Sequence, residues 1–90
     1  MPLFALICRD APGMLETRLA VREQHLAWLG QRAGLQLAGP FIEDGKPCGS
    51  LVVVEGDSLD AVRDWAAGDP YAQAGVFGSV EICEWRKVIG

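Results

Sequence analysis

The stretch PLFALICR, residues 2–9, carries apolar side chains at both its odd and its even positions. Successive side chains of a β-strand point to opposite faces of a sheet, so a strand built from this stretch is apolar on both faces. The stretch SLVVVE, residues 50–55, has the same property. We therefore predict that these two stretches are the central strands of one sheet.

The remaining periodicities predict helices and further strands around this pair. Residues 14–34 and 58–68 repeat apolar side chains at helical spacing, with Gly34 ending the first helix and Asp57 or Ser58 capping the second. Residues 35–43 predict a strand at an edge of the sheet, because Pro40 cannot donate a hydrogen bond to a neighbouring strand. The other segments are predicted to be a turn, a compact connection and the last strand: residues 44–49, 69–76 and 77–89.

The predicted order of elements is βαββαβ over a single domain, residues 1–90. Right-handed crossovers turn this order into a ferredoxin-like α+β fold, which is an antiparallel sheet with both helices on one face. Two helices cover only one face, and the two-sided strands leave a second apolar face open to solvent. We therefore expect a homodimer in which the open sheet faces pack together.

The composition excludes several kinds of partner and site. A net charge of −4 argues against binding to nucleic acid or to an anionic membrane surface, and no apolar run approaches the roughly 18 residues of a membrane helix. The three cysteines are odd in number and form no C-x-x-C pair, so we expect no disulfide framework, no metal site and a cytoplasmic location. Cys8 and Cys83 are expected to be buried, and Cys48 to lie in an exposed turn.

The segment RLAVREQHLAWLG, residues 18–30, holds the chain's single histidine. A helical projection puts Leu19 and Leu26 on the apolar face, and puts Arg18, Arg22 and His25 on a strip beside it, away from the solvated side. One interpretation is an anion-binding cleft, in which arginine holds a carboxylate or phosphate and histidine transfers a proton. The other is structural: the arginines extend to solvent and His25 covers an edge of the core.

The segment GDPYAQAG, residues 68–75, offers a carboxylate with two interpretations. Asp69 before Pro70 is a typical N-cap of a short helical turn, which explains the segment without any function. Alternatively, Asp69 accepts a hydrogen bond from one nitrogen of His25 and fixes its tautomer.

From its first predicted strand to its C-terminus the chain resembles the YciI-like family of small α+β dimers. The resemblance rests on RLAVREQHLAWL, on AGPF followed by a turn and GS, and on GDPYAQAGVF before a strand ending in WRKV. It implies a dimeric α+β barrel, a proposed histidine–aspartate site at His25 and Asp69, and, in some relatives, dehydrochlorinase activity on chlorinated aromatic compounds. Glu23 is one departure, since close relatives are expected to carry proline there; it lies on the solvated side of the helix.

Two further positions are candidates for contact with a ligand. Gly39, beside Pro40, leaves little side chain on its strand, so a ligand can approach the backbone there. Ser50 can donate a hydrogen bond into the cleft, although a serine at that place is also an ordinary turn residue.

We interpret the chain as an enzyme that uses no cofactor and transfers a proton on a small organic anion, by isomerisation or elimination. In this hypothesis His25 is the general acid or base, Asp69 orients it, and Arg18 and Arg22 hold the substrate. Two alternatives stay open. A non-catalytic ligand-binding protein needs the arginines but no titrating pair, and a structural dimerisation module needs neither.

Overall fold

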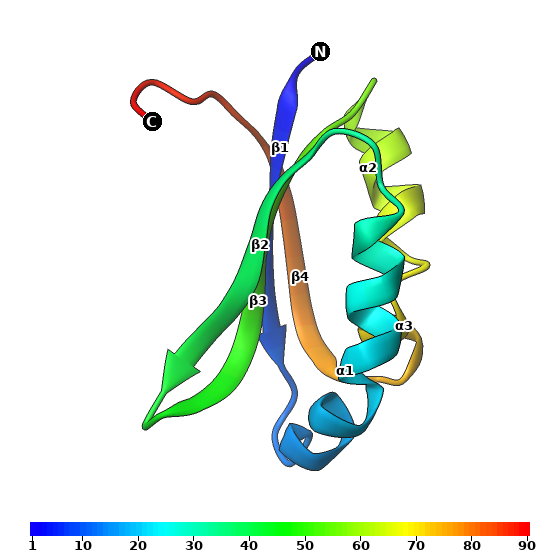
Figure 1. Cartoon of the computed structure of the whole chain (residues 1–90), viewed down its shortest axis with the longest axis vertical. Coiled ribbons are helices and arrows are strands. Elements are labelled where there is room, and N and C mark those ends of the chain that lie inside the picture. The colour runs from blue at the N-terminus through cyan, green and yellow to red at the C-terminus, as the bar shows by residue number, and fades with distance from the viewer.

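The computed structural model describes all 90 residues and contains four strands and three helices. In chain order these are β1 (Leu3–Asp10), α1 (Leu15–Gly30), β2 (Leu35–Glu43), β3 (Lys46–Glu55), α2 (Leu59–Ala66), α3 (Pro70–Gln73) and β4 (Phe77–Trp85). The helices lie along one face of the sheet, as Figure 1 shows. None of them has the length and apolar character needed to cross a lipid bilayer.

The sheet has the strand order β2-β3-β1-β4, and every neighbouring pair is antiparallel. The ferredoxin-like α+β fold predicted from the sequence is therefore confirmed. β1 and β3 are the central strands, in a register that pairs Leu6 with Val52, and β2 with its Pro40 is an edge strand. The two stretches with apolar side chains on both faces, PLFALICR and SLVVVE, are thus in the two strands that have a neighbour on each side.

The hydrophobic core lies between the sheet and the helices. Alternate residues of the central strands point toward the helices and are joined there by one residue from each long helix: Phe4, Leu6, Cys8, Val52, Val54, Leu29 and Val62. The same alternation places Ser50 on the helix side, where it ends this row of β3. On the helix side of β3 the side chains therefore change from apolar at Val54 and Val52 to polar at Ser50. Ser50 belongs to the candidate site described below.

The opposite face of the sheet has no helix on it (Figure 1). Ala5 and Val53 in its middle are buried by the side chains around them, whereas Leu37 and Trp85 are 51% and 41% exposed. The C-terminal residues after Trp85 extend away on this side of the sheet (Figure 1). An apolar and partly exposed sheet face is therefore present in the single chain.

The connection between β2 and β3 is shorter than predicted. We expected a turn over residues 44–49, but β3 already begins at Lys46. Only Asp44 and Gly45 form the turn, with φ of 52° and 75°. Positive φ at both central residues matches the right-handed twist of a hairpin, and Asp-Gly is a favoured pair for it. Cys48 consequently lies in a strand, half-buried, with its Sγ donating to the carbonyl of Phe41.

Three other segments end earlier than their periodicity indicated. α1 stops at Gly30, and Gly34 takes a φ of 83° just before β2. α2 begins after Ser58, whose hydroxyl accepts from the amide of Ala61, and ends at Ala66. β4 ends at Trp85 because β1, its only neighbour, pairs no further than Leu3.

The prediction for Cys83 was wrong. Cys83 pairs with Ala5 on the open face of the edge strand β4 and is exposed, because no helix covers that face. Cys8 is buried on the helix side, as predicted.

Candidate active site

The inner side of α1 is charged. Arg18 and His25 are buried, with only 3% and 6% of their surface exposed, and Leu29 lies with them. The sequence projection placed Leu19 and Leu26 on the buried face, which was wrong: they are 55% and 46% exposed. The helix is rotated so that Arg18 and His25 face the sheet and α3, while these leucines border a pocket. Arg22, which the projection also placed away from the solvated side, is exposed, so that part of the prediction was wrong.

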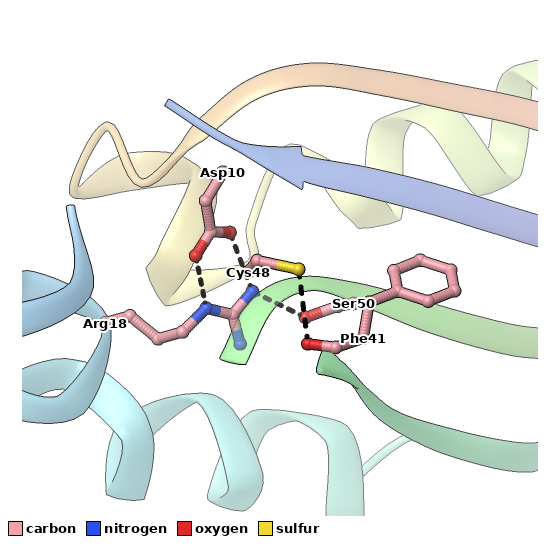
Figure 2. A network of polar contacts seen from close by, with 5 residues as sticks. All are labelled: Asp10, Arg18, Phe41, Cys48 and Ser50. Carbon is pink, nitrogen blue, oxygen red and sulfur yellow. Dashed lines mark hydrogen bonds and ion pairs between the residues drawn. The ribbon is translucent and has the colours of Figure 1, made fainter. Parts of the chain in front are cut away.

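Arg18 is held by two other elements. Its Nε donates to Oδ2 of Asp10 at 2.7 Å and its Nη2 to Oδ1 at 2.9 Å, so that the pair is bidentate. Nη2 also donates to Oγ of Ser50 at 2.8 Å. Figure 2 shows the guanidinium of Arg18 between Asp10, the last residue of β1, and Ser50 of β3. The side chain of Arg18 therefore links α1 to both central strands of the sheet.

The electrostatics of this contact favour a permanently charged arginine. Burial alone lowers the pKa of Arg18, but the hydrogen bonds and the charge of Asp10 outweigh it and raise the pKa above its usual value. The Asp10 carboxylate, 9% exposed, neutralises much of that charge. Arg18 is thus mainly part of a buried ion pair, a partner that the sequence analysis did not identify.

Asp69 makes both of the contacts that its sequence allowed. Its Oδ1 accepts from the backbone amide of Tyr71 at 2.9 Å, which caps α3, and lies 2.8 Å from Nδ1 of His25. The carboxylate is an acceptor, so Nδ1 carries the hydrogen of that contact when the imidazole is neutral. Nε2 is then the ring nitrogen available to a ligand.

Tyr71, which the sequence analysis did not select, packs between the two buried groups. Its ring stacks on the ring of His25 at 3.9 Å between centroids, and the guanidinium of Arg18 lies 4.4 Å from its centroid. Phe77 meets the Tyr71 ring edge-on at 5.9 Å. Its local sequence, one residue after Asp69-Pro70, gave no signal of this position.

These side chains border one pocket of about 250 Å³ between α1 and the β2–β3 hairpin. Its polar lining is Arg18, Arg22, His25, Ser50 and Tyr71. Gly39 and apolar side chains that include Leu19, Leu26 and Ile42 complete the lining. Asp69 is not part of the lining, because it contacts the inner nitrogen of His25. The structure thus places each other candidate site residue at this pocket.

Arg22 and Gly39 differ from the buried members of the lining. Arg22 is exposed and makes no ion pair within the chain, so its charge is available to a ligand. Gly39 pairs with Leu51, and residues of that register point to the open face of the sheet. It therefore borders the pocket through its backbone only.

Two other features lack this combination of groups. A more open hollow of about 520 Å³ lies among α2, α3 and β4, lined mostly by alanines, Val80 and Ile82, and holds no histidine. Cys8 lies near the candidate site, but burial, followed by the charge of Asp69, raises the pKa of its thiol to about 12. A thiol with that pKa stays protonated at neutral pH and is a poor nucleophile.

The chain is similar to several known proteins in sequence and in fold. The family model described as YCII-related domain matches residues 2–86. An uncharacterised protein of Haemophilus influenzae is 43% identical, covering 94% of this chain and 97% of its own, and Protein YciI of Escherichia coli is 36% identical, covering 96% and 98%. A solved structure of 5-chloro-2-hydroxyhydroquinone dehydrochlorinase from Burkholderia phenoliruptrix, in complex with 2,5-dihydroxybenzoquinone, has a TM-score of 0.84 and 31% identity, covering 93% of each chain.

Proposed function

The chain belongs to the family of YCII-related domains, and we propose that it is an enzyme that transfers a proton on a small organic anion. The observation that carries this proposal is the buried pair of His25 and Asp69, with Nδ1 and Oδ1 2.8 Å apart beside a pocket. A carboxylate on one ring nitrogen fixes the tautomer and leaves the other nitrogen to exchange a proton with a ligand.

The proposed roles follow from the position of each group. His25 is the general acid or base through Nε2, and Asp69 orients it. Arg22 holds the negative charge of the ligand, with Arg18 beside it as a fixed cation already shared with Asp10. Ser50 and the backbone of Gly39 contribute contacts from the sheet side of the pocket.

Two reactions suit this arrangement. In an isomerisation, the base removes a proton next to a carbonyl, and an acid returns it to another atom of the same molecule. In an elimination, removal of that proton leaves its bonding electron pair behind. This electron pair expels a leaving group, such as chloride, from the neighbouring carbon. Negative charge develops on oxygen in both cases, and a nearby cation stabilises it. The dehydrochlorinase of similar structure supports including the second reaction.

We further propose that the active form is a homodimer joined through the open sheet faces, and that it works in the cytoplasm. The exposed apolar Leu37 and Trp85 on that face support the first proposal. Three free cysteines, with no disulfide among them, suit the reducing conditions of the second.

A proton-exchange assay tests the proposed reaction. The protein is incubated in D₂O with small keto acids and hydroxyaromatic acids, and deuterium incorporation is followed by mass spectrometry. 5-Chloro-2-hydroxyhydroquinone is assayed in parallel for released chloride. Binding of benzoate, inorganic phosphate and 2,5-dihydroxybenzoquinone is measured separately by NMR of the single histidine. We expect His25→Gln to abolish exchange, while Gln24→Ala, an exposed neighbour on the same helix, keeps it.

The outcomes separate the proposed enzyme from a ligand-binding protein. Exchange or chloride release that depends on His25 supports proton transfer. Anion binding without either reaction, and with an unchanged affinity in Asp69→Asn, supports a non-catalytic binding protein. Absence of both binding and reaction across these compounds contradicts the anion pocket itself.

A further inference from the structure

We propose that the hydroxyl group of Tyr71 is a further ligand-binding group of this pocket, which donates a hydrogen bond to the bound anion. This inference rests on the proposed function of the pocket as an anion site. It adds a neutral donor, from α3, to the charged groups that α1 supplies.

The first support is the rigidity of the Tyr71 side chain. The residue is only 2% exposed and is still part of the pocket lining. Its ring is fixed on one side by the His25 imidazole at 3.9 Å and on another by the Arg18 guanidinium at 4.4 Å. Its backbone amide is held by Asp69 at 2.9 Å. A group positioned on both its ring and its backbone has little rotamer freedom left to lose when a ligand binds.

The second support concerns the group that accepts a hydrogen bond from the Tyr71 hydroxyl. None of the side-chain hydrogen bonds within the chain has the Tyr71 hydroxyl as its donor. The cations that face it, Arg18 and Arg22, carry donors only and cannot accept its proton. An anion held beside these cations would offer that proton an acceptor.

The protonation state agrees with a donor. Burial raises the pKa of the Tyr71 phenol, and the charges of Arg18 and Arg22 lower it without cancelling that rise. The hydroxyl therefore keeps its proton at neutral pH. It selects ligands that present an oxygen lone pair on the α3 side of the pocket, such as a carboxylate, a phenolate or a carbonyl oxygen.

The test compares the protein with Tyr71→Phe, which keeps the ring stack and removes only the hydroxyl. Binding of benzoate and inorganic phosphate is measured through the NMR signal of the single histidine, together with the Cζ signal of ¹³C-labelled tyrosine, of which the chain has one. We expect the tyrosine signal to move with the same affinity as the histidine signal, and Tyr71→Phe to weaken binding by roughly tenfold.

The possible failures are distinguishable. If an anion binds with equal affinity to both proteins and leaves the tyrosine signal unchanged, the hydroxyl has no role and the anion pocket stands. If neither anion moves the histidine signal in either protein, the anion pocket and the role of Tyr71 are both overturned. The one-dimensional proton spectrum of Tyr71→Phe shows whether the variant is folded.

Discussion

Arg18 and Asp10 form a buried ion pair in which two nitrogens of the guanidinium contact two oxygens of the carboxylate, at 2.7 and 2.9 Å. The pair joins the first turn of α1 to the last residue of β1. Most of the charge of Arg18 is therefore balanced inside the chain. Arg22, one turn further along the helix, carries the unbalanced positive charge of the pocket.

Removal of Asp10 is expected to destabilise the fold. In Asp10→Ala, Arg18 stays buried without its counter-ion, and the loss of one partner of a buried pair costs about 3 kcal/mol or more. Urea unfolding followed by circular dichroism measures this change in the free energy of unfolding. The matched control is Asp60→Ala, whose partner Arg63 lies at 3.6 Å in a largely exposed pair and whose loss costs no more than about 1 kcal/mol. Equal costs in both variants contradict the structural role of Asp10.

Replacement of Arg22 is expected to remove anion binding and leave stability nearly unchanged. The residue is exposed and has no ion-pair partner, so Arg22→Leu removes no internal contact of that kind. Phosphate or benzoate should raise the melting temperature of the original protein but not of this variant. Arg63→Leu removes the same charge outside the pocket and should keep the response. If Arg63→Leu also loses the response, the effect comes from the net charge of the protein and not from the pocket.

Asp69→Asn separates the two contacts of this carboxylate. Asparagine caps a helix about as well as aspartate, so the α3 cap and the stability should be kept to within about 0.5 kcal/mol. The charge next to His25 is lost, and the NMR signal of the single histidine should move, because its Nδ1 then contacts an amide group. Once a substrate is known, kcat should fall more than the affinity for substrate.

The control for this variant is Asp64→Asn, which removes an exposed carboxylate of α2. It should leave both the histidine NMR signal and kcat as they are. If Asp69→Asn behaves like this control, Asp69 is a helix cap only.

The fold could be predicted from the sequence because the patterns that indicate its strands lie within short segments. Two-sided apolarity in PLFALICR and SLVVVE identified the central strands, and Pro40 identified an edge. The site was harder, since its contacts join distant segments. The helical projection correctly kept Arg18 and His25 away from solvent, but periodicity does not distinguish an apolar side chain in the core from one at a pocket, as Leu19 and Leu26 show.

Other members of the site had no local signal at all. Asp10 looks like the first residue of an Asp-Ala-Pro-Gly turn. Arg18 reaches it only because α1 packs against the sheet after this turn. Tyr71 looks like an ordinary residue after a proline, and its stacking on His25 depends on the packing of α3 against α1.

Alkaline pH is expected to destabilise the protein through two buried acids. Burial raises the pKa of Cys8 from 9.0 to about 12 and raises that of Tyr71 above 10.0. Both groups bind their protons more tightly when folded, so their contribution is complete below pH 9 and is lost as the pH rises through the folded-state values. Absorbance of the single tyrosine at alkaline pH should show its raised pKa. Unfolding in urea at pH 8 and pH 11 should show the loss of stability.

The same burial predicts that the Cys8 thiol is protected in the folded protein. Iodoacetamide at pH 8, followed by peptide mass spectrometry, should modify Cys8 only after unfolding. Rapid modification of Cys8 in the folded protein contradicts the packing of β1 against the helices.

The open sheet face predicts a dimer that a single charge disrupts. Light scattering at micromolar concentration should give twice the mass of one chain. A side chain added at Gly39 points to the open face, where no atom of the same chain lies within 4 Å, so Gly39→Glu should fold but place a charge in the dimer interface. We expect this variant to be a monomer, whereas Gly39→Ala, which adds one methyl group, stays a dimer. A monomeric original protein, or a Gly39→Glu variant that still dimerises, means that the sheet face is not the interface.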